Sequence, residues 1–338
     1  MSLRLLEFVV RPDRVEDITA LLEDKNIHHM WVTESNDSSA AVRILLDAEA
    51  VEEITDLLAD RMGRDEDHRM VLVAVEATVP RIEEPPEEEA EEESAEEKET
   101  RALRISREEL YEDLKSGTRL TPSYATMVAL STVVAAVGLV SGDVAIIIGA
   151  MVIAPLLGPT MALAFANTLG DTALTKGAAK TMAVAFAIAA AISLALGLVL
   201  DVDPAAPEIA SRIGAGFGNI ALALAAGAAG SLAFTTGVPA ALVGVMVAVA
   251  LLPPLTAAGL LAGDGHLQQS LGALLLLVTN VASISIAAMA TFAIQRVRPR
   301  TWWEAEQATK ARRTAIIAWA ITLAILAAII AFGQVSAV

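Results

Sequence analysis

Seven long apolar runs dominate this chain and constrain its fold more than any other feature. They cover residues 122–140, 144–169, 178–200, 218–236, 239–262, 267–294 and 314–332. A helix needs about 20 residues to cross the hydrocarbon core of a bilayer, and each run is close to that length or longer. The sequence therefore predicts a polytopic α-helical membrane protein with about seven transmembrane helices and the lipid bilayer as its first partner.

The charges between these runs predict an orientation. Loops on one side carry only Arg212 among basic residues, together with Asp143, Asp201, Asp203, Glu208 and Asp264. Segments on the other side carry Lys115, Arg119, Lys176, Lys180, Arg296, Arg298, Arg300, Lys310, Arg312 and Arg313. Basic loops stay inside the cell. We therefore expect a multi-pass protein of the cell membrane with a cytoplasmic N-terminal domain and an external C-terminus.

The second run is interrupted near its middle by Pro155, Gly158 and Pro159. Proline removes a backbone donor and clashes with the preceding turn of a helix. Non-helical backbone at membrane depth persists only where protein or a water-filled cavity covers it. This segment is thus the first place to expect a functional site, whether it crosses the membrane fully or returns as a re-entrant loop.

The interrupted run resembles a later one. A shift of 95 residues aligns Gly149 with Gly244 and Pro159 with Pro254. Units of three spans lie in opposite orientations, and an inverted repeat with two broken helices is typical of transporters, with the site near the midplane. The pattern predicts repeat units 122–200 and 218–294, with a second proline break at residues 252–254.

Polar and helix-breaking residues near the two expected breaks form the candidate substrate or pore site. They are Pro155, Gly158, Pro159, Asn167, Asp171, Pro253, Pro254, Thr279 and Asn280. Asn280 lies deep in an apolar run, so it either lines a polar path or hydrogen-bonds a neighbouring helix. Because the middle of each run lacks ionisable residues, half-helix ends and freed carbonyls would bind the solute.

Residues 1–81 alternate between strand and helix patterns. Strands are expected at 3–10, 27–34, 40–46 and 70–79, and amphipathic helices at 13–25 and 48–62. The helix sequence from Val15 to Leu22 matches that from Val51 to Leu58 at an offset of 36 residues. Two such halves predict a βαββαβ, ferredoxin-like α+β domain. It would serve as a ligand sensor or self-association module, or as a solvated cap that pairs subunits.

The sequence thus divides into five parts. They are the ferredoxin-like cytoplasmic domain (1–81), an acidic disordered linker (82–100), an amphipathic approach helix (101–121), a six-span membrane core (122–295), and a basic loop with the seventh span (296–338). The linker carries 11 glutamates and has almost no apolar side chains to bury.

Composition and motifs argue against a catalytic or metal-binding site. The chain has no cysteine, and it contains neither an HExxH nor a GxSxG motif. His28, His29 and His68 lack the spacing of metal ligands. We therefore expect no enzymatic activity, cofactor, metal or nucleic-acid partner.

The net charge of −17 resides largely in the soluble part, and only 6 of the 24 basic residues are lysine. A highly charged acidic surface keeps a protein soluble in concentrated salt. The composition predicts a halophilic, archaeal source, although an ordinary acidic cytosolic domain is the alternative.

Three motifs together resemble a known family. They are the GAMVIAPLLGP segment, the paired ALLPP segment and the Thr279–Asn280 pair, supported by the EIASR sequence that begins at Glu208. The chain resembles the archaeal and bacterial membrane proteins grouped as an uncharacterised hydrophobic domain, domain of unknown function 389. The resemblance covers about residues 120–295 and implies a membrane fold without implying an activity.

The sequence favours a transporter or channel-like protein for a small solute or ion, regulated or assembled through its cytoplasmic domain. The alternative is a non-transporting scaffold or sensor whose βαββαβ domain binds a ligand or partner. Small-residue helix faces, such as ALALAAGAAG from Ala221 to Gly230, favour close helix packing and a homo-oligomer.

Overall fold

The computed structural model describes most of the chain. The described residues are 3–36, 39–48, 50–62, 68–75, 78, 107–214, 216–236, 240–295 and several single positions between 313 and 324. The chain forms two compact units, and the boundary between them falls after Tyr111. The two are treated separately below.

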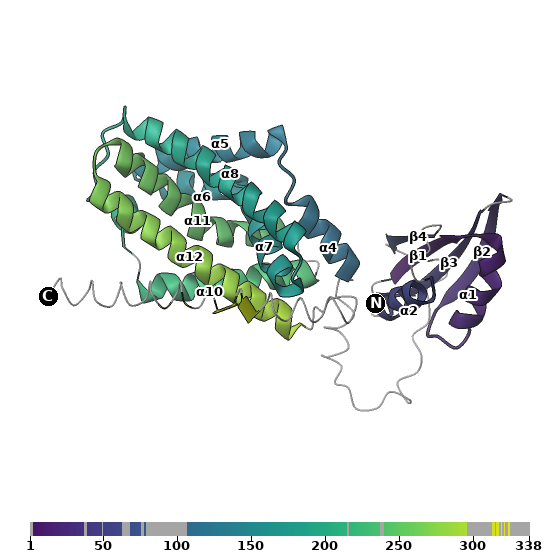
Figure 1. Cartoon of the computed structure of the whole chain (residues 1–338). Helices are drawn as coiled ribbons and strands as arrows, with labels where there is room; N and C mark the ends of the chain where they lie inside the picture. The colour runs from purple at the N-terminus through teal and green to yellow at the C-terminus, as the bar shows by residue number, and fades with distance from the viewer. Residues whose placement is uncertain are drawn as a thin grey trace. The chain divides into compact units, whose positions relative to one another are not determined.

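The N-terminal unit contains a small antiparallel sheet and two helices (Figure 1). Its elements are β1 (Leu3–Val10), the 3₁₀ helix η1 (Pro12–Arg14), α1 (Val15–Leu22), β2 (His29–Asn36), β3 (Ser39–Asp47), α2 (Val51–Met62) and β4 (Arg69–Val75). The strand order is β2-β3-β1-β4. The predicted antiparallel sheet with its intervening helices is confirmed, whereas the linker at 82–100 lies outside the described residues.

Alternation along the strands creates the core of this unit. In β1 every second residue is buried, and Leu6 and Phe8 pair with Ile44 and Val42 of β3. The same cluster contains side chains from both helices, including Ile18, Leu22, Ile54 and Leu58. Both helices therefore cover the same face of the sheet, which leaves the other face open.

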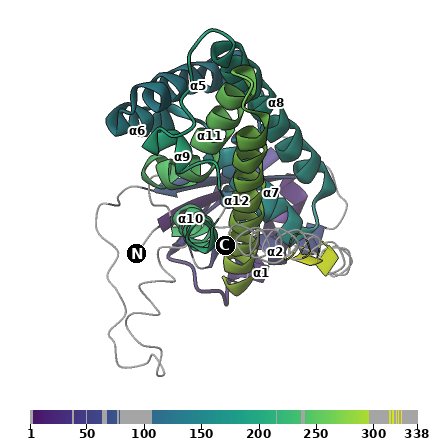
Figure 2. The same ribbon diagram turned by 90° about the vertical axis from the view of Figure 1, so that its left-hand side faces the viewer.

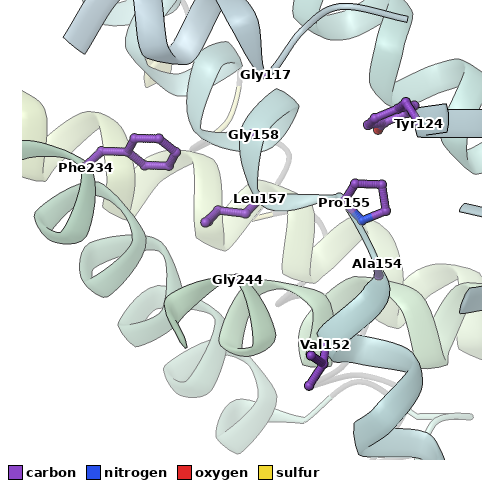
Figure 3. A pocket seen from close by; sticks show the side chains of 9 residues that line it. All are labelled: Gly117, Tyr124, Val152, Ala154, Pro155, Leu157, Gly158, Phe234 and Gly244. Atoms are coloured by element: carbon purple, nitrogen blue, oxygen red, sulfur yellow. The ribbon is translucent and has the colours of Figure 1, made fainter. Parts of the chain in front are cut away.

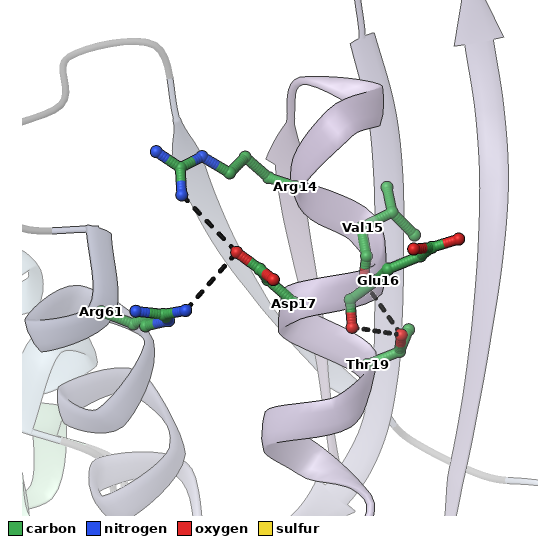
Figure 4. Close-up of polar contacts among 6 residues, drawn as sticks. All are labelled: Arg14, Val15, Glu16, Asp17, Thr19 and Arg61. Atoms are coloured by element: carbon green, nitrogen blue, oxygen red, sulfur yellow. Dashed lines mark hydrogen bonds and ion pairs between the residues drawn. The ribbon is translucent and has the colours of Figure 1, made fainter.

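A carboxylate connects the two helices at the surface. Asp17 of α1 lies 3.6 Å from the Arg14 guanidinium and 3.5 Å from that of Arg61 on α2 (Figure 4). Exposed ion pairs contribute at most about 1 kcal/mol. Asp17 thus helps to align the helices, while the buried apolar cluster supplies most of the stability.

The second unit is helical. Its elements are α4 (Arg107–Ser116), α5 (Pro122–Ser141), α6 (Val144–Ile153), α7 (Leu157–Leu169), α8 (Thr172–Gly197), α9 (Pro207–Ala210), α10 (Phe217–Thr236), α11 (Ala240–Gly263) and α12 (Leu267–Ile294). Among the described residues, five helices are long and apolar enough to cross a membrane, and the bent pair α6–α7 makes up to six. The protein is a multi-pass membrane protein. The seventh predicted span, 314–332, falls almost entirely outside the described residues.

Local sequence explains where these helices begin and end. Thr121 Oγ1 accepts a hydrogen bond from the Tyr124 N–H at 3.1 Å and caps α5. Asp143 caps α6 in the same way. Gly142 and Gly170 end α5 and α7 with φ values of 69° and 72°, a left-handed conformation that glycine adopts without a steric penalty.

Helix α11 lies among α5, α8 and α12 and forms the centre of the unit (Figure 2). Small residues permit its close packing against α8. A Cβ on Gly197 of α8 would collide with the Leu260 carbonyl, and a Cβ on Gly259 would collide with the Ser193 hydroxyl. The contact between α8 and α11 is therefore made partly between backbones.

The predicted second break at residues 252–254 is wrong. Helix α11 continues through Pro253 and Pro254. A mid-helix proline leaves the carbonyl four residues earlier without its usual donor. For Pro254 that carbonyl belongs to Ala250, and the Asn280 side chain of α12 donates a hydrogen bond to it at 2.7 Å. The neighbouring helix thus supplies the missing donor, and α11 does not break.

Candidate functional site

The first proline break is present. Helix α6 ends at Ile153, α7 begins at Leu157, and the two axes differ by 55°. Pro155 has no N–H to donate to the Met151 carbonyl, and the preceding residue, Ala154, leaves the helical conformation with φ −66° and ψ 118°, as a following proline favours. Pro159 lies in the first turn of α7, where its missing N–H would have no intrahelical partner anyway. Pro155 is therefore the residue that causes the break.

A cavity of about 320 Å³ lies at this break (Figure 3). Its lining comes from several elements that are distant in the sequence. The lining residues are Gly117, Tyr124, Val152, Ala154, Pro155, Leu157, Gly158, Phe234 and Gly244. The break thus borders a partly open space lined by α5, α6, α7, α10, α11 and the turn after α4.

One wall of the cavity is a contact between two glycines. A Cβ on Gly158 would lie 3.2 Å from the Gly117 Cα, closer than nine in ten real Cβ contacts. The adjacent turn is fixed by the Thr181 hydroxyl of α8, which donates to the Thr118 carbonyl at 2.6 Å. Glycine at both positions therefore lets the turn after α4 touch the first turn of α7.

Backbone groups supply most of the polarity of the cavity. None of the nine described lining residues has an ionisable side chain except Tyr124. Leu156, the N-cap residue of α7, provides no side-chain acceptor, so the first N–H groups of α7 remain uncapped by a side chain. The N-terminus of a helix carries a partial positive charge of about half a unit.

Tyr124 has an unusual environment. Its side chain is 9% exposed, and its hydroxyl is buried without a hydrogen-bond partner. Leaving a buried hydroxyl unpaired costs about 1–3 kcal/mol. In Figure 3 the ring lies beside Pro155 and lines the cavity, whereas its hydroxyl oxygen is covered by other atoms.

The cavity includes some of the predicted site residues and excludes others. Pro155 and Gly158 line it, and Pro159 is buried in the same turn of α7. Pro253 and Pro254 lie inside α11 and do not line it. The residue that α11 contributes is Gly244, one of the glycines matched in the sequence repeat.

Asn280 and Thr279 have structural partners. The Asn280 amide donates to the Ala250 carbonyl, which favours the interhelical hydrogen bond over a pore-lining role. Its Oδ1 remains buried without a partner, as does the Thr256 hydroxyl. The Thr279 hydroxyl donates to the Leu275 carbonyl within α12 at 2.8 Å.

Asp171 and Asn167 lie at the turn between α7 and α8, away from the cavity lining. Asp171 Oδ1 accepts hydrogen bonds from the N–H groups of Ala173 and Leu174, both at 2.9 Å, and caps α8. Asn167 Oδ1 accepts a hydrogen bond from the Thr175 hydroxyl at 3.4 Å. Both side chains contribute to the geometry of this turn.

Seven of the nine lining residues were not predicted as site residues. Val152, Ala154 and Leu157 flank the predicted break, and the other four come from elsewhere in the sequence: Gly117, Tyr124, Phe234 and Gly244. Of these four residues, only Gly244 stood out in the sequence, because the 95-residue repeat aligns it with Gly149. Tyr124 follows the N-cap residue Thr121, but nothing in the sequence indicates that its hydroxyl lacks a partner.

A partly buried arginine lies outside the spans, in the loop between α9 and α10. Burial lowers the pKa of Arg212, and the nearby Glu208 carboxylate opposes that shift. Its Nε has no hydrogen-bond partner. Next to it, the Ile213 carbonyl lies where a side chain at Gly272 of α12 would be, so this loop is packed closely onto the bundle.

These features define a class: a polytopic membrane protein with a small α+β unit, built on an antiparallel sheet, before a helical unit that contains a bent helix pair. The chain belongs to the family described as domain of unknown function, DUF389, whose pattern matches residues 151–286. It is 35% identical over 320 residues to the uncharacterized protein MJ0678 of Methanocaldococcus jannaschii, covering 94% of this chain and 96% of that protein. The resemblance inferred from the motifs is confirmed. No solved structure matches the chain.

Proposed function

We propose that this protein is a transporter or channel-like protein that moves a small solute or ion across the cell membrane. The observation that carries the proposal is the cavity at the Pro155 break. A bent helix leaves backbone groups unpaired at membrane depth, and such groups are tolerated where they line a cavity. At about 30 Å³ per water molecule, 320 Å³ holds about ten waters or one small solute.

The inverted repeat stays part of this proposal in a modified form. Helix α11 packs against both α6 and α7, and its Gly244 lines the cavity. The two halves are not equivalent, because α6–α7 is bent whereas α11 is continuous. In this form one repeat unit supplies the broken helix and the other supplies a rigid wall.

The N-terminal unit would regulate or assemble the membrane unit from the cytoplasmic side. The strand order β2-β3-β1-β4 supports a ferredoxin-like sandwich. Val71 and Val73 of β4 are 41% and 46% exposed and share the face opposite the helices with Glu7 and Leu5, and apolar side chains on an open sheet suit self-association into a homo-oligomer.

Flux into proteoliposomes tests the proposal. We expect the purified full-length chain to catalyse movement of at least one solute from a panel of inorganic ions and small metabolites. Gly244→Leu should lower that flux at least tenfold, because its side chain would occupy the cavity beside Leu157, which lies 3.7 Å from a Cβ at this position.

Gly149→Leu is the matched control, since a Cβ there meets no atom within 4 Å. It should leave the flux unchanged. Folded protein that moves no member of the panel would contradict transport. A ligand-induced rise in melting temperature confined to the N-terminal unit would then favour the scaffold or sensor.

A further inference from the structure

Helix α8 has the least covered surface of the long apolar helices. Among the five described helices that could cross a membrane, it has the smallest buried share, and in Figure 2 it lies at one edge of the bundle. Its exposed apolar residues recur at spacings of three and four, which places them on one helical face. They are Ala183, Ala187, Ala191 and Leu194. In a membrane this face meets lipid tails.

Two lysines continue the same face toward the start of α8. Lys180 and Lys176 precede Ala183 by three and seven positions, and both are exposed. Lys180 and the exposed C-cap residue Leu198 are 18 positions apart, which is about 27 Å along a helix at about 1.5 Å per residue. The hydrocarbon core of a bilayer is about 30 Å thick. The apolar face therefore spans most of that core, and the lysines lie at the level of the lipid headgroups.

A third cation reaches the same place from another element. The Thr181 hydroxyl donates to the Thr118 carbonyl at 2.6 Å, which fixes the turn after α4 against α8. Arg119 directly follows Thr118 and is exposed, and Lys180 directly precedes Thr181. The chain thus brings the backbone of Arg119 beside the part of α8 that carries the lysines.

These three cations form no ion pair within the described part of the chain. Of the nearby carboxylates, Glu112 pairs with Lys115 at 2.7 Å, and Asp171 accepts hydrogen bonds from the first N–H groups of α8. Asp113 of α4 is exposed, which leaves three cations to one carboxylate. In a chain with a net charge of −17, this local excess of positive charge favours an anionic partner.

We propose that Lys176, Lys180 and Arg119 bind the phosphate of an anionic phospholipid whose acyl chains lie along the exposed face of α8. Residues one helical turn apart have Cβ atoms about 6 Å apart, so both lysines can contact one phosphate. Arginine binds phosphate with two parallel hydrogen bonds. The apolar residues that follow the lysines on the same face favour a lipid over a soluble phosphate. This binding does not depend on the proposed transport.

Native mass spectrometry of the full-length chain, delipidated in detergent micelles, tests the assignment. The probes are phosphatidylglycerol and phosphatidylcholine with identical acyl chains, and glycerol phosphate, which has none. Each cation near a membrane surface favours an anionic headgroup about fivefold. We expect phosphatidylglycerol to bind at least tenfold more tightly than phosphatidylcholine, and glycerol phosphate to bind at least tenfold more weakly than phosphatidylglycerol.

Variants connect this preference to the three cations. Lys176→Gln/Lys180→Gln should lower the preference for phosphatidylglycerol at least fivefold, whereas Lys176→Arg/Lys180→Arg should retain it. Lys25→Gln/Arg11→Gln removes two cations from the N-terminal unit and is the matched control for net charge, so it should leave the preference unchanged. In the wild type, phosphatidylglycerol should also slow amide hydrogen exchange at residues 117–120 more than phosphatidylcholine does.

The assignment is overturned if the two lipids bind equally well, or if the double glutamine variant keeps the wild-type preference. Glycerol phosphate that binds as tightly as phosphatidylglycerol would also overturn it, by showing a site for soluble phosphate. The mass spectra report the oligomeric state as well. Oligomers that bind no lipid and protect residues 117–120 from exchange would assign this face to contact between copies instead.

Discussion

Proline has two different structural outcomes in this protein, and the neighbouring side chains decide between them. Pro155 ends α6, whereas Pro253 and Pro254 lie within a continuous α11. The difference at Pro254 is the Asn280 amide, which donates to the carbonyl that the proline leaves free. A polar residue on one helix thus supports the continuity of another.

This relation predicts coupling between Asn280 and Pro254. Asn280→Leu should lower the free energy of unfolding by about 2 kcal/mol, because the buried Ala250 carbonyl loses its donor. In a Pro254→Ala background, the N–H of residue 254 can serve that carbonyl, so the same substitution should cost about 1 kcal/mol less. Unfolding in mixed micelles measures both, and equal costs in the two backgrounds would contradict the relation.

Asp171 provides a second test at the scale of single residues. Since its carboxylate caps α8, Asp171→Ala should lower the free energy of unfolding by about 1 kcal/mol, whereas Asp171→Asn, a good N-cap, should cost only a few tenths. Flux normalised to folded protein should be unchanged in both. If Asp171→Asn abolishes flux in stable protein, the residue belongs to the solute path as the sequence suggested.

At the scale of helices, the apolar runs at 122–140 and 144–169 predicted ends close to those observed. Thr121-Pro122, Asp143 and the left-handed glycines at 142 and 170 account for these ends in the structure. The signals are local hydrogen bonds and backbone preferences, which neighbouring residues determine. The prediction of a break at residues 252–254 was wrong because the outcome there is not local. It depends on Asn280, which lies on a different helix.

The cavity was only partly predictable for the same reason. Pro155 and Gly158 were identified because the break is a local property of α6 and α7. Tyr124 and Phe234 enter the lining from α5 and α10, and their positions depend on how the helices pack. Whether the Tyr124 hydroxyl has a partner is a property of that packing.

Backbone contact between α8 and α11 gives a prediction about helix packing. Gly197→Ala should lower the free energy of unfolding by about 1–3 kcal/mol, because its Cβ would collide with the Leu260 carbonyl and separate the helices. Gly149→Ala, in open space on α6, should be neutral or stabilising by about 0.5–1 kcal/mol. Equal effects of the two substitutions in a thermal unfolding assay would contradict close packing at Gly197.

At the scale of the whole molecule, the two units differ in composition as well as in fold. Residues 1–81 carry 18 acidic and 9 basic side chains, while the helical unit is mostly apolar. The seventh span stays a prediction because it falls almost entirely outside the described residues. The orientation in the membrane and the halophilic source also stay predictions.

The excess of acidic groups in the N-terminal unit predicts a response to salt. Screening relieves repulsion among carboxylates, and the few exposed ion pairs it weakens are worth little. Molar KCl should therefore raise the melting temperature of this unit by about 5 °C, which corresponds to about 1 kcal/mol for a domain of this size. Calorimetry of the full-length chain measures it, with sucrose as a control for nonionic solvent effects. No rise would contradict a halophilic source.

The contact between Gly117 and Gly158 has a mechanical consequence. Side chains between packed elements are compliant because they can change rotamer, but here two backbones touch directly. The turn after α4 also connects that helix to α5. If α4 moved by a fraction of an ångström, the start of α7 would therefore move with it, and the volume of the cavity would change.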